Sequence, residues 1–311
     1  MFKTKGIHHI SAIVGNPQEN FDFYSGILGL RLVKKTVNFE DPGAYHLYFG
    51  NDKGSPGTIM TFFPWVKGFR GRVGTGQVGA TSFAIPQGSM PFWEKRLHAN
   101  QVLFNKRVRF GETYLSFDDP HGLQLELVER EEGARSEWPF NGGSPETAIK
   151  GFAGAVLLSS SPGHTMGLLR SGLGFEAAGK DGNYVRYRSE GEFGNIIDVD
   201  VSERERGRMG TGTVHHIAFR AQDSAEQIEA RAFIINKGYT VTPVKNRKYF
   251  QAIYFKEHGD ILFEIATDPP GFLIDEELDH LGESLMLPDE YEDKRGEIEA
   301  SLIEIRMQET E

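Results

Sequence analysis

The amino-acid sequence predicts an α+β fold built from four β-α-β-β-β modules. Short apolar runs that alternate with period 2 indicate strands, and longer segments with apolar residues at helical spacing lie between them. The same order of runs occurs four times along the chain, which indicates an internal repeat. A length of 311 residues allows two domains of ordinary size, each with its own core.

The first module begins at residues 7–13, an alternating run that predicts a strand with His9 on one face. The Asn-Pro pair at residues 16–17 is typical of a helix start, with a capping residue before a proline at the first helical position. No Asp or Glu occurs between Asp52 and Glu94, so the last strand of this module carries no carboxylate. Its later predicted strands are Leu30–Asn38, Ala44–Phe49 and Thr58–Phe63.

The second and third modules repeat this order without the histidine. Ala80 and Ala153 are predicted to stand at the histidine position, while Glu126 and Asp198 lie on the last strands. Because these carboxylates have no histidine partner, we interpret them as structural residues. The predicted segments are Gly79–Ile85, Ser89–Asn100, Thr113–Phe117 and Leu123–Val128 in the second module, and Gly151–Leu157 and Asn195–Val201 in the third.

The fourth module repeats the histidine. The run at residues 214–219 alternates and predicts a strand with His216 on one face. A helix is expected at residues 224–236, with Ser224 as its N-cap. Two further predicted strands follow at Gln251–Lys256 and Ile261–Ala266.

The last strand of the fourth module carries Glu264, so this module combines an imidazole on its first strand with a carboxylate on its last. A neutral imidazole and an ionised carboxylate are ligands that suit a divalent first-row metal.

The repeat predicts two consecutive domains, because the first and third modules resemble each other and so do the second and fourth. We place the domains at residues 6–130 and 150–272, with a polar linker rich in Glu, Gly and Pro at 131–149. An acidic helical tail is expected at residues 273–311. Its apolar residues predict an amphipathic helix that packs back onto the body, and they are Leu287, Tyr291, Ile298, Leu302 and Ile305.

Composition and charge narrow the possible partners. A net charge of −10 argues against nucleic acid or an anionic membrane surface as a partner. No apolar run approaches the roughly 20 residues of a membrane span, and no signal-peptide pattern precedes the first strand, so a cytoplasmic location is expected. The sequence has no Cys, which excludes disulfides and leaves His, Asp and Glu as candidate metal ligands.

Four such modules with few metal-ligand residues resemble the vicinal oxygen chelate superfamily, which includes glyoxalase I, fosfomycin-resistance proteins and extradiol dioxygenases. The resemblance covers residues 6–272. Three segments, Tyr45–Gly50, Ser55–Trp65 and Ile261–Asp268, more closely resemble bacterial ring-cleaving dioxygenases of the hydroquinone and catechol type. The resemblance implies that the modules pair into two open, cup-shaped mixed sheets with the helices outside.

The same resemblance implies a set of metal ligands, since each module of this superfamily contributes up to one ligand from its first strand and one from its last. The implied ligands are His9, His216 and Glu264, a facial triad of two histidines and one carboxylate. Such a triad leaves three positions of an octahedral ion open and is typical of Fe(2+) oxygenases. By strand alternation His8 and His215 point to the opposite face, and we interpret them as structural.

The ligand set also predicts how the modules pair. If neighbouring modules paired, His9 would lie apart from His216 and Glu264, and each cup would hold only two ligands. Pairing the first module with the fourth and the second with the third brings the three ligands together. A domain-swapped homodimer would supply the same set between two chains and stays open.

The function that the resemblance implies is an extradiol-type ring-cleaving dioxygenase that acts with Fe(2+) and O₂ on a hydroquinone- or catechol-like aromatic diol. Tyr249 and His46 are the candidates for its acid/base group, with Arg247 or Tyr254 as substitutes. The candidates for an aromatic pocket wall are Phe62, Phe63, Trp65 and Phe69.

Two other functions stay open. A glyoxalase-like metal-dependent isomerase or lyase would need a fourth ligand, and the sequence has no acid near Thr61 to supply it. A non-catalytic drug-binding resistance protein would need no metal at all.

Overall fold

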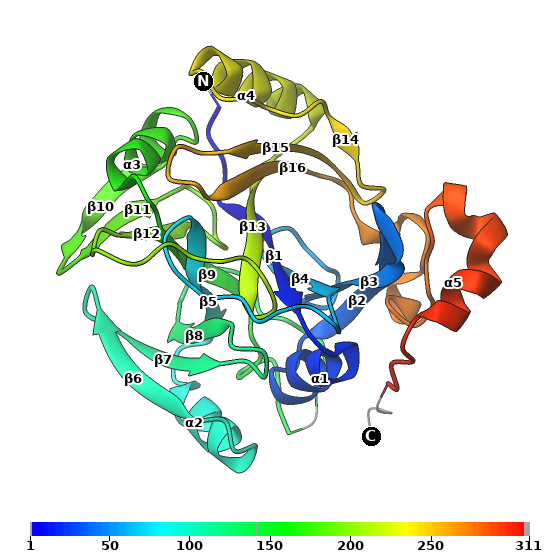
Figure 1. The fold of residues 1–311 in the computed structure, drawn as a ribbon. Coiled ribbons are helices and arrows are strands. Elements are labelled where there is room, and N and C mark those ends of the chain that lie inside the picture. The colour runs from blue at the N-terminus through cyan, green and yellow to red at the C-terminus, as the bar shows by residue number, and fades with distance from the viewer. Residues whose placement is uncertain (1, 141, 308–311) are drawn as a thin grey trace.

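The computed structural model describes residues 2–140 and 142–307. Within these residues the strands form two sheets of eight strands each, and the helices lie outside them (Figure 1). This arrangement confirms the predicted fold class. None of the described helices combines the length and the apolar character that crossing a bilayer requires.

The first sheet is formed by the first and fourth modules. Its strands are β1 (Ile7–Val14), β2 (Arg31–Asn38), β3 (Asp41–Gly50), β4 (Ile59–Pro64), β13 (Thr213–Ala221), β14 (Lys245–Asn246), β15 (Phe250–Lys256) and β16 (Leu262–Pro270). Their order across the sheet is β14-β15-β16-β13-β1-β4-β3-β2, so the first strands of the two modules lie side by side at the centre (Figure 1).

The second sheet is formed by the second and third modules. Its strands are β5 (Gln77–Ile85), β6 (Phe104–Arg109), β7 (Glu112–Asp118), β8 (Gln124–Glu129), β9 (Gly151–Leu158), β10 (Glu176–Asp181), β11 (Tyr184–Arg188) and β12 (Ile196–Asp200). Their order is β10-β11-β12-β9-β5-β8-β7-β6. The predicted pairing of the modules is therefore confirmed. The division into consecutive domains at 6–130 and 150–272 stays a prediction, and each sheet takes one module from each half of the chain.

Five α-helices are present among the described residues. They are α1 (Pro17–Phe21), which continues as a π-helical turn (Asp22–Ile27), α2 (Met90–Ala99), α3 (Pro162–Ser171), α4 (Ser224–Asn236) and α5 (Arg295–Ser301). The Asn16 side chain accepts hydrogen bonds from the first turn of α1, as predicted. The predicted cap of α4 is wrong by one residue. Asp223 accepts from the Glu226 amide, while the Ser224 hydroxyl donates to Gln251 instead.

The strand register shows what replaces the histidines in the second sheet. Strands β9 and β5 pair antiparallel, as β1 and β13 do. The residues of the two strand pairs can be matched by placing Glu126 of the second sheet at the position of Glu264 in the first. This alignment confirms Ala80 at the position of His216 but places Gly154 at the position of His9. The predicted Ala153 is wrong by one residue, because β9 is buried along its whole length and its apolar run gives no alternation to fix the register.

Two buried guanidinium groups neutralise the carboxylates of the second sheet. Arg109 donates to both carboxylate oxygens of Glu126, at 3.0 and 2.8 Å, and to Asp198 at 2.7 Å. Arg186 donates to both oxygens of Asp198, at 2.7 and 2.9 Å. Because buried carboxylates need partners of opposite charge, these contacts agree with the structural interpretation of Glu126 and Asp198.

The acidic tail packs back onto the first sheet, as predicted. Leu287 and Ile298 are buried against Val37 of β2. The helical part is shorter than the apolar spacing suggests, because α5 has only seven residues and the rest consists of 3₁₀ turns and extended segments. These turns are Phe272–Ile274, Leu278–His280 and Asp289–Lys294. Residues 308–311 of the predicted tail lie outside the described residues.

We expect Arg109→Ala to lower the free energy of unfolding by about 3–5 kcal/mol, because it leaves Glu126 and part of Asp198 unpaired in a buried site. Urea denaturation of the metal-free protein measures this loss. The matched control is Arg188→Ala in the same sheet, which removes an exposed pair with Glu132 and is expected to cost less than about 1 kcal/mol. Equal losses in the two variants would contradict a special role for Arg109.

Candidate metal centre

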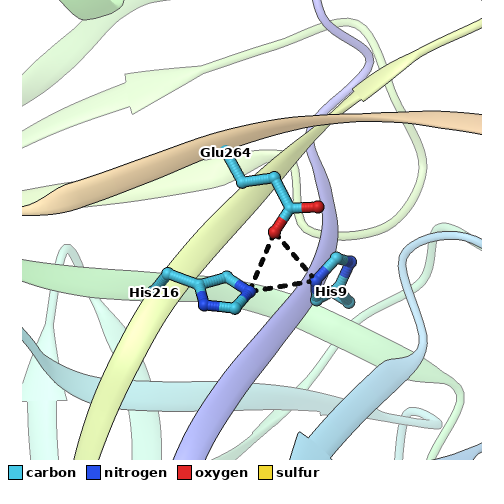
Figure 2. A group of neighbouring side chains, drawn as sticks. All are labelled: His9, His216 and Glu264. Carbon is cyan, nitrogen blue, oxygen red and sulfur yellow. Dashed lines mark hydrogen bonds and ion pairs between the residues drawn. The ribbon is translucent and has the colours of Figure 1, made fainter. Parts of the chain in front are cut away.

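Three side chains from three neighbouring strands converge on one point of the first sheet. They are His9 of β1, His216 of β13 and Glu264 of β16, and all three are buried (Figure 2). The Nε2 atoms of the two histidines lie 3.2 Å apart. Glu264 Oε2 lies 2.8 Å from His216 Nε2 and 3.3 Å from His9 Nε2. One chain therefore brings together the three ligands that the sequence predicted.

The triangle of ligand atoms has the size that a divalent ion requires. Ligand atoms at about 2.1 Å from an ion lie roughly 3.0 Å apart at a right angle and roughly 3.4 Å apart at a tetrahedral angle. The observed 2.8, 3.2 and 3.3 Å are close to these values. Moreover, neither carboxylate oxygen of Glu264 receives an aligned hydrogen bond from the described residues, although both are buried. Since a buried carboxylate without a cationic partner is costly, the donor set suits a cation.

The charge states of the triad are those of metal ligands. Burial by itself raises the pKa of Glu264, but the neighbouring His9 and His216 outweigh burial and bring this pKa well below its ordinary value. Burial lowers the pKa of His216, and the attraction of Glu264 only partly opposes this effect. At neutral pH the centre therefore presents an ionised carboxylate and a neutral His216 imidazole, the forms that bind metal.

Each metal-ligand histidine is held by the histidine before it in the sequence. His8 Nδ1 lies 2.9 Å from His9 Nδ1, and His215 Nδ1 lies 2.7 Å from His216 Nδ1. Because this bond engages Nδ1, it orients each ring with Nε2 toward the centre. Burial and the neighbouring His216 lower the pKa of His215 to about 4.

His215 also lines the cavity beside the centre, so the interpretation of this residue as purely structural is incomplete. Strand alternation describes the direction of the Cα–Cβ bond and does not say where the ring of a long side chain ends.

A cavity of about 330 Å³ opens beside His9 and His216. Its walls include Phe63 and Trp65, two of the four aromatic residues predicted to line a pocket. The prediction is wrong for Phe62, which is buried in the core with its ring 4.4 Å from that of Tyr24.

The fourth predicted wall residue, Phe69, is not among the residues that line the cavity; it is half exposed and packs against Trp65 at the surface. Phe62 and Phe63 are adjacent in β4 and point to opposite faces, so only one of them can face the cavity.

His46 lies in the wall of this cavity, as expected for a group near the chemistry. Its ring is held between those of Tyr48 and Phe63, with centroid distances of 4.1 and 4.2 Å. Nδ1 is 2.9 Å from the Tyr48 hydroxyl and Nε2 is 3.0 Å from the Thr61 hydroxyl. Burial lowers the pKa of His46 well below its ordinary value, so the imidazole is neutral at pH 7.

Tyr249, unlike the other acid/base candidates, does not face the cavity. Its hydroxyl donates to Asp275 Oδ2 at 3.0 Å, and it is not among the residues that line the cavity. Its catalytic role stays a prediction.

The two substitutes named from the sequence, Arg247 and Tyr254, both line the cavity. Arg247 Nε donates to the Tyr254 hydroxyl at 3.2 Å, and the Tyr254 ring lies 5.6 Å from that of His216. Burial and the nearby Glu264 raise the pKa of Tyr254 well above its ordinary value, so the phenol keeps its proton in the metal-free protein.

Comparisons with known proteins agree with this geometry. The chain is 59% identical over 307 residues to the "Putative ring-cleaving dioxygenase MhqO" of Bacillus subtilis (strain 168), covering 99% of this chain and 98% of that protein. It is 34% identical to the chlorohydroquinone/hydroquinone 1,2-dioxygenase of Sphingobium indicum, covering 95% of each chain. A crystal structure described as a "putative dioxygenase" from Bacillus subtilis superposes with a TM-score of 0.98 at 58% identity, over 99% of this chain and all of that one.

A family model matches nearly the whole of the folded body, from residue 6 to residue 275. The match includes both sheets and all three residues of the metal centre. The chain belongs to the glyoxalase/bleomycin resistance protein/dioxygenase superfamily.

Proposed function

We propose that this protein is an Fe(2+)-dependent ring-cleaving dioxygenase that acts on a hydroquinone- or catechol-like aromatic diol. The observation that carries the proposal is the triad of His9, His216 and Glu264, whose two histidines line a cavity with aromatic walls. Three protein ligands on one face leave room for both a diol and O₂ at the ion. The relatives named as dioxygenases support the same reaction class.

The bound ion would serve as a Lewis acid for the diol oxygens and as the site where O₂ is activated. The chain itself supplies the other requirements. Phe63 and Trp65 offer apolar ring faces to an aromatic substrate, while Arg247 places a positive charge in the same cavity. A guanidinium there favours the ionised form of a phenol that enters, and so assists its deprotonation.

The position equivalent to Glu264 argues against the isomerase alternative. Thr61 pairs with the residue two positions after His9, as Glu264 pairs with the residue two positions after His216. A site with a ligand on both last strands would therefore need an acid at position 61. Instead the Thr61 hydroxyl is bonded to His46 at 3.0 Å and to Ser11 at 2.7 Å. This neutral network supports a site with three ligands.

A resistance protein that binds a drug without turnover would not need the triad. The buried Glu264 carboxylate, which contacts two imidazoles, is a cost that a purely apolar binding cavity avoids.

Two cavity residues are suited to move the diol protons. His46 is neutral but has both nitrogens hydrogen-bonded, so it accepts a proton only by exchanging its bond with Tyr48 or Thr61 for one with the substrate. Tyr254 has its hydroxyl against Arg247 and its ring near His216. We propose His46 as the acid/base group and Tyr254 as its substitute. Tyr249 stays a weaker candidate because its hydroxyl is bonded to Asp275.

Replacing His216 or Glu264 with Ala is expected to abolish metal binding, because two ligands hold Fe(2+) weakly. Metal analysis after anaerobic reconstitution should give about one iron per chain for the unmodified protein and near zero for either variant. His280→Ala, at an exposed histidine, is the control that keeps the metal. Stoichiometric zinc held by four protein ligands, or full oxygenase activity in Glu264→Ala, would refute the proposed function.

Thr61→Glu is expected to keep the metal but to abolish oxygen uptake with hydroquinone or catechol, because a fourth carboxylate takes a position that the diol or O₂ needs. Thr61→Val removes the hydroxyl without adding a ligand and should retain measurable oxygen uptake. An oxygen electrode and metal analysis on the same samples give both results. Unchanged uptake by Thr61→Glu would mean that this position does not face the ion.

For the proton-transfer step, His46→Ala should keep its iron and lose roughly 10²–10⁴-fold in kcat, the usual contribution of an acid/base group. Tyr254→Phe and Tyr249→Phe, measured in parallel by steady-state oxygen uptake, show whether either tyrosine shares the role. We expect the smaller loss for Tyr249→Phe. Full turnover in His46→Ala together with a large loss in Tyr254→Phe would transfer the assignment to Tyr254.

A further inference from the structure

The first sheet is open, with β2 at one end of the strand order and β14 and β15 at the other. One segment of the chain contacts both ends. It is the start of the acidic tail, residues 271–287, which directly follows β16. This segment supplies no residue to the metal centre or to the lining of the cavity.

Asp275 is the residue of this segment that joins the two ends. At one end, Lys34 of β2 donates from Nζ to Asp275 Oδ1 at 2.7 Å and also pairs with Glu276. At the other end, the Tyr249 hydroxyl and Lys248 Nζ each lie 3.0 Å from Asp275 Oδ2. The Lys34 side chain has no exposed surface. A buried ammonium requires anionic partners, so this carboxylate fixes the position of β2 as well as that of the tail.

Other tail contacts reach the same strands. Phe272 packs between the rings of Tyr48 and Tyr249, with centroid distances of 5.2 and 5.0 Å. The Met286 amide donates to the carbonyl of Lys35 at 2.9 Å, so the tail adds a short backbone pairing to the edge of β2. Farther along, the Tyr291 hydroxyl donates to the Phe39 carbonyl at 2.9 Å.

These contacts act on the hairpin of β2 and β3, which forms one wall of the cavity. The hairpin supplies the cavity residues Asn38, Phe39, Glu40, Asp41, His46 and Tyr48. Tyr48 connects the two sets of contacts, because its ring packs on Phe272 and its hydroxyl is bonded to His46. Contacts with the tail therefore stabilise the position of the hairpin that carries His46.

The metal ligands depend on different interactions. His9, His216 and Glu264 lie on β1, β13 and β16, and each of these strands is paired with a neighbour on both sides, whereas β2, which the tail contacts, is paired only with β3. A change in the tail can therefore shift the hairpin wall without moving the ligands.

We propose that Asp275 is a positioning residue that holds the β2–β3 wall of the cavity at a fixed distance from the metal ligands. The expected effect of Asp275 on diol binding rests on the proposed function, whereas its effect on the position of the wall is independent of that function. Asp275 touches neither the cavity nor the triad and acts only through Lys34, Tyr249 and the strands that carry them.

The first experiment compares Asp275→Asn with the unmodified protein after iron loading under anaerobic conditions. We expect the iron content to stay the same and the dissociation constant for hydroquinone or catechol to rise by roughly 10–10²-fold, the effect of displacing a binding group by about 1 Å. Anaerobic calorimetric titration measures it without turnover. Asp268→Asn is the matched control, since it removes a carboxylate paired with Arg220 in the same sheet and is expected to change neither quantity.

The second experiment measures the rate of amide hydrogen exchange in the β2–β3 wall of the iron-loaded proteins. Asp275→Asn should speed exchange in residues 36–46 and leave residues 8–13 and 214–219 unchanged. Tyr291→Phe, which removes only the bond to the Phe39 carbonyl, should give a smaller effect confined to the same hairpin. This variant keeps the test valid if Asp275→Asn does not fold.

The possible outcomes distinguish a failure of the positioning role of Asp275 from a failure of the proposed function. Loss of iron together with diol binding in Asp275→Asn, or equal exchange across the whole sheet, would overturn the positioning role and indicate a general loss of stability. Unchanged exchange in the hairpin would overturn it as well. If the unmodified protein binds no diol, the proposed function fails, and selective exchange in residues 36–46 still establishes that Asp275 holds the wall.

Discussion

The contact of the Glu264 carboxylate with the imidazoles of His9 and His216 is the interaction on which the site depends. Glu264 is buried, and no described residue donates an aligned hydrogen bond to either of its oxygens. Because His216 is neutral at pH 7, the negative charge of the carboxylate favours a cation bound between the three side chains. The two central strands of the first sheet bring the histidines to it, and this requires the first and the fourth module to pair across almost the whole length of the chain.

Both sheets contain buried carboxylates, and they differ in the groups that stabilise these negative charges. In the first sheet, the buried carboxylate meets two imidazoles, and the set is suited to a metal ion. In the second sheet, Gly154 and Ala80 replace the histidines, and Arg109 fills the role of the cation for Glu126 and Asp198. A guanidinium built into the chain needs no exchangeable ligand and leaves no open position, so the second sheet holds a fixed cation where the first holds a candidate metal site.

The proposed activity also depends on parts of the chain that carry no ligand. The strands β1, β13 and β16 carry the three residues of the metal centre, while the β2–β3 hairpin supplies His46 and other residues of the cavity wall. Within this hairpin, β2 lies at the edge of the open sheet, where backbone pairing on one side is missing. The tail contacts this edge and also the segment before β15. These contacts explain why part of an acidic segment outside the repeat is buried.

The sequence alone was sufficient for the repeat, the order of strands within each module, the three residues of the metal centre and the pairing of the first module with the fourth. The repeat and the order of strands follow from local periodicity. The residues of the metal centre follow from the resemblance to the vicinal oxygen chelate superfamily, and the pairing of the modules follows from counting those ligands. Only the tertiary structure decided which partners the polar ends of the long side chains contact. Tyr249 and Tyr254 lie five residues apart in the sequence, yet the hydroxyl of one is bonded to Asp275 of the tail and that of the other to Arg247 in the cavity. The ring of His215 and the guanidinium of Arg109 likewise take positions set by neighbours that are distant in the sequence. Periodicity fixes the direction in which a side chain leaves the backbone, whereas the charges and volumes that it meets in the folded chain determine which partner its polar end reaches.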